Sequence, residues 1–277
     1  MKKYSTIALL MLPLSLSVMA ANSFTINESE ITVPAPKGFV PITDDMTAVK
    51  RIVESMADPV NDTLAYYISE SEVPTAMAGD VPSLERTFIL KVNKQLRSMT
   101  MGKNDFSQLK EMAVSQNQQI LEEVKSQMPE HMKNMSQGFS REFDVDFALN
   151  LSQMIPLEPH YQSENALAYS MYINYGVTAN NESEDVIVAA TATFLNTSGV
   201  VLFLYSYASQ DDLEWTRNAS KDWAESVISS NSQPPAKSPG RGIDWDKVME
   251  KGLVGAVVGG LFALLAGAAS LFKRKKG

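Results

Sequence analysis

Apolar and polar residues alternate along the second half of the chain in a way that predicts a β-meander. From Leu167 to Val177 every second residue is apolar, which is typical of a strand with one buried face. Two more strand-like runs follow at residues 185–195 and 200–208, and the turns between the runs contain Asn180-Asn181 and Ser198-Gly199. We therefore expect three consecutive antiparallel strands.

The first half of the chain carries weaker strand signals. Residues 63–69 and 86–93 are rich in apolar and aromatic residues and predict two strands. Residues 31–40 predict a further strand. Because this segment contains Pro34 and Pro36, and proline cannot donate to a sheet ladder, we expect it at an edge of the sheet.

Helical periodicity separates these strands. Apolar residues recur at helical spacing in residues 44–57, in 105–128 and in 211–229. We expect Pro129 to break the second helix, and a further helical segment to run to about residue 137 and end at Gly138. This order predicts an α+β fold with a largely antiparallel sheet and helices packed on it.

The N-terminus has the pattern of a secretory signal peptide. Lys2 and Lys3 precede an apolar run at residues 7–18, and small residues follow as far as Ala20. A charged start, a short apolar run and small residues at the cleavage point define such a signal. We therefore expect residues 1–20 to direct export and to be removed.

The C-terminus predicts a membrane anchor. Within residues 251–272, the 21 residues after Lys251 carry no charge. As a helix with a rise of 1.5 Å per residue, they would extend about 31 Å, which is close to the hydrocarbon thickness of a bilayer. The basic tail at residues 273–277 follows directly. Export followed by a stop-transfer helix places the bulk of the chain outside and the C-terminus in the cytoplasm.

Small residues form a ridge along this span. Gly255, Gly259, Ala263 and Gly267 recur every four residues, a spacing that allows two membrane helices to approach closely. The ridge predicts a homodimer. The alternative is that glycine and alanine are simply common in membrane helices, and the sequence leaves both interpretations open.

Between the two ends lies one domain. Residues 21–228 have the length of a single exported domain. Residues 229–250 contain several proline, glycine and serine residues and predict a linker and juxtamembrane segment, which at about 3.1 Å per residue would hold the domain some tens of ångströms from the bilayer.

Composition excludes several classes of protein. The 277-residue chain contains no cysteine, which rules out disulfides, cysteine-ligated metals and a cysteine nucleophile. Its net charge is −8, but six basic residues lie at the two ends, so the stretch between them holds 18 basic and 32 acidic residues, a net charge of −14. An acidic body argues against a nucleic-acid-binding protein.

The order of elements resembles a known family. The opening ITVPAPKGFVPIT, the long middle helix, the meander and the closing helix after VVLFLYSYA are similar to the PsbP-like α/β/α sandwich over roughly residues 23–230. Unlike the envelope lipoproteins of that family, this chain lacks the cysteine that carries their lipid. The family has no shared active site, so the resemblance implies a binding or adaptor domain.

No pattern in the sequence predicts a catalytic or cofactor site. There is no G-x-S-x-G, H-E-x-x-H or Walker-type loop. One of the two histidines, His160, lies ahead of the meander and is expected to be a loop or strand-edge residue. We assign no catalytic, cofactor-binding or metal-binding residue and expect no cofactor.

One cluster offers an alternative. Met128, His131, Met132 and Met135 have i, i+3, i+4 and i+7 spacing, which on a helix places them on one side, and thioether and imidazole groups suit Cu(I). The competing interpretation is that these methionines fill the core. Tyrosines in the predicted strands are weak evidence for a ligand groove, because strands favour aromatic residues.

Together these patterns predict a non-catalytic binding or adaptor domain, tethered to the bacterial inner membrane and lying in the periplasm. Its expected partners are the lipid bilayer, an envelope protein and a second copy of itself, with no nucleic acid. The alternative is a periplasmic metal-handling or hydrolytic domain.

Overall fold

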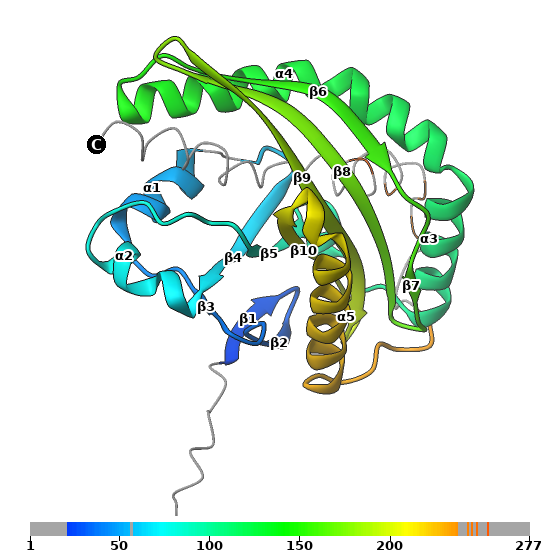
Figure 1. Ribbon diagram of the computed structural model, residues 1–277. Helices are drawn as coiled ribbons and strands as arrows, with labels where there is room; N and C mark the ends of the chain where they lie inside the picture. Colours follow the sequence, from blue (N-terminus) through cyan, green and yellow to red (C-terminus); the bar gives the residue numbers. More distant parts are fainter. Residues whose placement is uncertain are drawn as a thin grey trace, which may run out of the picture.

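An antiparallel sheet runs through the domain, and helices cover both of its faces (Figure 1). The computed structural model describes residues 21–55 and 58–237 and positions 243, 245, 248 and 254. The strands are β1 (Ala21–Ile26), β2 (Ser29–Pro34), β3 (Phe39–Pro41), β4 (Asn61–Ser69), β5 (Thr87–Asn93), β6 (Phe147–Pro156), β7 (Tyr161–Gln162), β8 (Ala166–Ala179), β9 (Glu182–Thr197) and β10 (Val200–Ser209). The α-helices are α1 (Thr47–Ser55), α2 (Val73–Met77), α3 (Lys103–Ser115), α4 (Asn117–Phe143) and α5 (Leu213–Ser229), and short 3₁₀ turns are η1 (Glu70–Glu72), η2 (Leu96–Ser98) and η3 (Gln210–Asp212).

The main sheet has eight strands in the order β3-β4-β5-β10-β9-β8-β6, and β7 pairs with β8 beyond the end of β6. Every pairing is antiparallel. The predicted meander is confirmed as β8, β9 and β10. Asn180, Asn181, Ser198 and Gly199 adopt the positive φ angles that tight hairpin turns require. The α+β class with a largely antiparallel sheet is therefore correct.

The single strand predicted at residues 31–40 is wrong. Pro34 ends β2, which pairs with β1 in a hairpin separate from the main sheet. A turn then forms in which the Phe39 N–H donates to the Pro36 carbonyl at 3.0 Å, with Gly38 at φ +79°. The chain enters the main sheet only at β3, which forms one edge.

The predicted helix break at Pro129 is also wrong. Pro129 and Gly138 both lie inside α4, and the break falls at Gln116, whose φ of −106° and ψ of 15° are not helical. A proline removes one backbone donor, and tertiary packing can retain the helix around it. Gly138 is required inside the helix because a Cβ there would lie 2.6 Å from the Ser55 carbonyl oxygen of α1.

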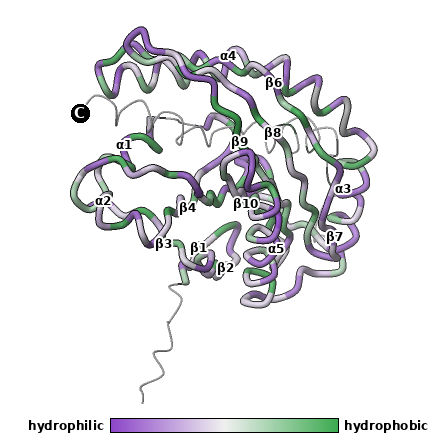
Figure 2. Tube along the Cα trace, in the orientation of Figure 1, coloured by the Kyte–Doolittle hydropathy of each residue, from purple (hydrophilic) through white to green (hydrophobic). Residues whose placement is uncertain are grey.

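Helix α5 and the β1–β2 hairpin cover one face of the sheet, called here the outer face. Hydrophobic and hydrophilic residues alternate along α5 (Figure 2), and its apolar side buries Trp223, Ala224 and Val227. Trp223 packs edge-on against Tyr67 and Phe88 of the sheet, at ring-centroid distances of 5.4 and 5.3 Å. This packing forms one of the two hydrophobic cores.

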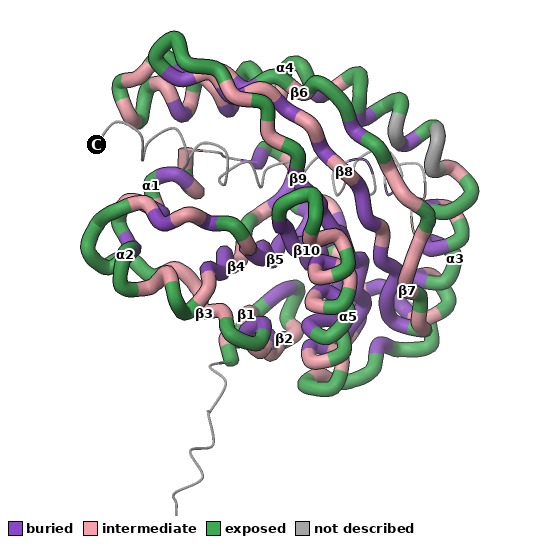
Figure 3. Tube along the Cα trace, viewed as in Figure 1, coloured by how far each residue is buried: buried purple, intermediate pink, exposed green. Residues whose placement is uncertain are grey.

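The opposite, inner face forms the second core with α1, α3 and α4. Its central strands are buried, while the tip of the β8–β9 hairpin is exposed (Figure 3). Phe203, Tyr205 and Tyr207 of β10 lie on this face. Helix α4 runs beside the edge strand β6 (Figure 1). The functional candidate described below lies at this junction.

The predicted terminal segments fall largely outside the described residues. The signal peptide at residues 1–20 and the ridge at Gly255, Gly259, Ala263 and Gly267 lie outside them, as do all residues of the predicted span except Val254. No helix in the described part of the chain is long and apolar enough to cross a membrane.

Candidate binding groove

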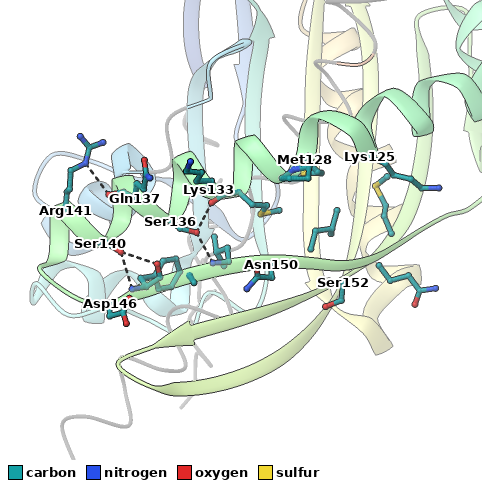
Figure 4. Close-up of a pocket in the computed structure, with 18 residues that line it drawn as sticks. Lys125, Met128, Lys133, Ser136, Gln137, Ser140, Arg141, Asp146, Asn150 and Ser152 are labelled. Carbon is teal, nitrogen blue, oxygen red and sulfur yellow. Dashed lines mark hydrogen bonds between the residues drawn. The ribbon is translucent and has the colours of Figure 1, made fainter.

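An open groove of about 1130 Å³ lies between α4 and the edge strand β6. The two elements are joined by a short turn in which Asp144 adopts the left-handed conformation, with φ and ψ of 50°. This turn reverses the chain, so that the strand returns beside the helix that precedes it (Figure 4). The groove is therefore built by one continuous segment of sequence.

Two serines of α4 hold the start of β6 in place. The Ser136 hydroxyl accepts a hydrogen bond from the Leu149 N–H at 2.9 Å, and the Ser140 hydroxyl accepts one from the Phe147 N–H at 3.2 Å (Figure 4). Ser140 also donates to the Phe147 carbonyl at 3.1 Å. These bonds satisfy backbone groups that an edge strand otherwise leaves open.

The free edge of β6 continues beyond these serines. In an antiparallel strand, alternate residues direct their N–H and C=O groups to the same side, so Leu151 faces the same open edge as Phe147 and Leu149. In the described residues, Leu151 makes no hydrogen bond to α4. A bulge between Leu151 and Gln153 follows, and Ile155 is 43% exposed. This part of the edge is accessible for strand addition.

The groove combines an apolar floor with a basic rim. Met128, Met132, Leu149 and Met154 are buried at its base. Lys125, Lys133 and Arg141 line it with one acidic residue, Asp146. Lys125 pairs with Glu122 at 2.9 Å, whereas Lys133 and Arg141 make no ion pair with any described residue. The groove is thus locally basic on an acidic protein.

The methionines of the predicted copper cluster lie in the inner-face core. Met128, Met132 and Met135 are 3–4% exposed and pack in that core, which is the arrangement that the packing interpretation predicts. Among the described residues, no group of three or more histidine or acidic side chains could hold a metal ion. Copper binding stays an untested prediction.

The tyrosines in the strands divide between the two faces. Tyr66, Tyr175, Tyr205 and Tyr207 are buried on the inner face, and Tyr67 is buried on the outer face. They are core residues in this structure and do not line the α4–β6 groove. The weak sequence indication of a tyrosine-lined groove therefore does not locate the candidate site.

His160 lies at the edge of a buried hydroxyl network. Its Nδ1 lies 3.2 Å from the Ser170 hydroxyl, which is 2.8 Å from the Thr191 hydroxyl and accepts from Arg217 Nε at 3.3 Å. Burial and the Arg217 charge lower the pKa of His160 to about 4, against a smaller opposing effect of Glu214. Because Ser170 is fully buried, this Ser–His contact does not present a nucleophile to a substrate.

This environment predicts acid sensitivity. The pKa of His160 in the folded protein is about 4, below the ordinary value of 6.5. At a pH between these two values the unfolded chain binds more protons than the folded protein. The free energy of unfolding therefore falls as the pH is lowered through this range. We expect His160→Gln to lose less stability than the wild type between pH 7 and pH 4.5, measured by urea unfolding. Equal pH dependence of the two proteins would contradict the proposed environment of His160.

The structure also contains a buried ion pair that sequence analysis missed. Lys91 Nζ lies 2.9 Å from Asp58 Oδ2, and the two side chains are 2% and 1% exposed. Asp58 also accepts from the Val60 and Asn61 amides and from Asn61 Nδ2. Burial alone would raise the pKa of Asp58, but Lys91 and these hydrogen bonds outweigh it and hold that pKa below its usual range. The pair joins the loop after α1 to the middle of β5.

The chain is similar to known proteins in its structure. No protein-family model matches the sequence, and the search of curated proteins found no match. Among solved structures, the chain is similar to the solution structure of cyanobacterial PsbP (CyanoP) from Synechocystis sp. PCC 6803, with 11% sequence identity and a TM-score of 0.27. The match covers 80% of this chain and 96% of that chain. PsbP is also the family that the order of elements in the sequence resembles.

Proposed function

We propose that this protein is a non-catalytic binding domain that captures an extended, acidic segment of a partner protein in the α4–β6 groove. The observation that carries the proposal is the open edge of β6 beside a groove with an apolar floor and a basic rim. An extended peptide can add a strand to such an edge, where main-chain hydrogen bonds give affinity and side-chain pockets give specificity.

Charge complementarity supports the choice of an acidic partner segment. Lys133 and Arg141 lie on the rim without an ion-pair partner among the described residues, and both are exposed. Opposite charges on the incoming segment would increase the association rate and fix its register. The buried floor formed by Met128 and Met132 suits apolar side chains, because methionine adapts its shape to different partners.

The sequence supports a location for this activity. The signal-peptide pattern and the apolar segment at residues 251–272 indicate an exported domain anchored in the bacterial inner membrane, with its bulk in the periplasm and its C-terminus in the cytoplasm. We therefore propose that the partner segment belongs to a protein of the cell envelope, and that the domain acts as an adaptor at the membrane.

Selection from a random octapeptide library on the purified full-length chain tests the proposal. We expect selected peptides to alternate apolar residues with Asp or Glu, and Lys133→Glu/Arg141→Glu to weaken their binding by about tenfold, which corresponds to about 1.4 kcal/mol. A matched control, Lys37→Glu/Lys221→Glu, makes the same change in net charge at exposed positions outside the groove. No selection of acidic peptides, or equal loss in both variants, would refute capture by the groove.

A further inference from the structure

Four apolar residues beyond the predicted domain boundary lie in the core of the inner face. Val248 and Val254 are 1% and 4% exposed and belong to the inner-face core. Ile243 and Trp245 are half-buried and pack against it. We call these four the C-terminal contact residues. They are the positions that the structure describes after Lys237.

The inner face presents a surface that needs such a cover. Val201, Phe203 and Tyr205 of β10 are 1–2% exposed on this face. Helix α5 and the β1–β2 hairpin lie on the opposite face and cannot cover them. The C-terminal contact residues belong to or pack against the same core as these strand residues, so they contribute to the burial of the inner-face core together with α1, α3 and α4.

Hydrogen bonds direct the chain from α5 toward this face. The Ser198 N–H donates to the Ser232 carbonyl at 2.9 Å, and the Lys103 N–H donates to the Pro235 carbonyl at 2.8 Å. Asn165 Nδ2 also donates to Gln233 Oε1 at 2.8 Å. Residues 232–236, which lie in the segment predicted as a linker, thus follow the domain surface from the β9–β10 turn to the start of α3. Helix α3 belongs to the inner-face layer.

We infer that the inner face of the sheet is the docking site of the chain's own C-terminal segment, through the C-terminal contact residues. Val254 is the fourth residue of the predicted span at residues 251–272. Because one side chain cannot be buried in the domain core and in lipid hydrocarbon at once, docking competes with insertion of the first turn of that span. The docked domain then lies directly at the bilayer surface and not at the distance that a free linker would allow.

Photo-crosslinking of the full-length chain tests this docking. Trp245 is replaced by benzoylphenylalanine, an aromatic residue of similar size, and the protein is reconstituted in vesicles of phosphatidylethanolamine and phosphatidylglycerol. We expect an intramolecular adduct, identified by mass spectrometry, on peptides that carry inner-face residues of the sheet, α1, α3 or α4. The same probe at Lys221, which is exposed on α5 at the outer face, should give no adduct with peptides of α1, α3 or α4.

Three outcomes would overturn the inference. The first is adducts of the Trp245 probe with lipid alone. The second is adducts between chains in a mixture of isotopically labelled and unlabelled protein. The third is equal yields of adducts with α1, α3 and α4 from the Trp245 and Lys221 probes. As a second test, Val248→Asp should lower the intramolecular yield of the Trp245 probe at least tenfold, whereas Lys221→Asp on the outer face should leave it unchanged. Val248→Ala is a milder variant if the aspartate prevents folding. Peptide selection by the α4–β6 groove measures a different surface, so failure of one proposal is distinguishable from failure of the other.

Discussion

Asp58→Asn is expected to destabilise the folded protein by about 3–5 kcal/mol, because it leaves the buried Lys91 ammonium without its countercharge. The substitution preserves the size of the side chain, so the loss reports the charge and not a cavity. Urea unfolding followed by circular dichroism at neutral pH measures the change. A loss below about 1 kcal/mol, the range of an exposed ion pair, would contradict the burial of this pair.

Removing both charges is the matched control. Asp58→Asn/Lys91→Met replaces the ammonium with an apolar chain of similar length, and buried ion pairs are often replaced in this way at little cost. We therefore expect the double variant to be more stable than Asp58→Asn alone. The wild type should lose the contribution of the pair as the pH falls through the lowered pKa of Asp58, whereas the double variant should not.

Trp223→Ala is expected to destabilise the protein by about 3–5 kcal/mol, the range for deleting a large buried aromatic side chain. Trp223 is 2% exposed, contacts Tyr67 and Phe88, and donates from Nε1 to the Pro34 carbonyl at 2.9 Å. It thus joins α5 to the sheet and to the end of β2. The free energy of unfolding in urea measures the effect.

Two variants separate the contributions to this contact. Trp223→Phe keeps most of the packing and removes the hydrogen bond, which leaves the Pro34 carbonyl without its indole donor, so we expect a smaller loss of about 1–3 kcal/mol. Trp215→Ala removes a half-buried tryptophan of the same helix, which Arg86 covers at 4.7 Å from the ring centroid. If Trp215→Ala costs as much as Trp223→Ala, the central role of Trp223 in the outer-face core is wrong.

The meander was predictable because its strands carry their own signals. The period-2 alternation of β8 and the polar residues at its turns are local features, and they specify strands and turns without reference to the rest of the chain. By contrast, β6 was missed. Its apolar residues Phe147, Leu149 and Leu151 alternate, but the bulge before Gln153 interrupts the pattern. An edge strand with a bulge carries a weaker signal than a central strand.

The groove could be predicted only in part. The sequence singles out Met128 and Met132 as residues of one helical face, and both lie on its floor. Lys133 and Arg141 form a rim because α4 continues through Pro129 and β6 returns beside it. Both features depend on tertiary packing, which no local pattern in the sequence specifies. The lone charge in the apolar run of β5 marks Lys91 as unusual, but no local pattern identifies Asp58, 33 residues earlier, as its partner.

The strand order has a consequence for the time course of folding. Strand β5 pairs with β10, so Lys91 lies opposite Phe203 and Thr87 opposite Tyr207, more than a hundred residues apart in sequence. The β8–β10 meander closes through short local loops, whereas the β5–β10 pairing must close a long one, which is slower. Because the chain is synthesised from its N-terminus, β4 and β5 are complete before β10 is available to pair with them. Until β10 pairs with β5, the apolar side chains of β4 and β5 lack its protection, and the partly folded chain is most prone to aggregate in that interval.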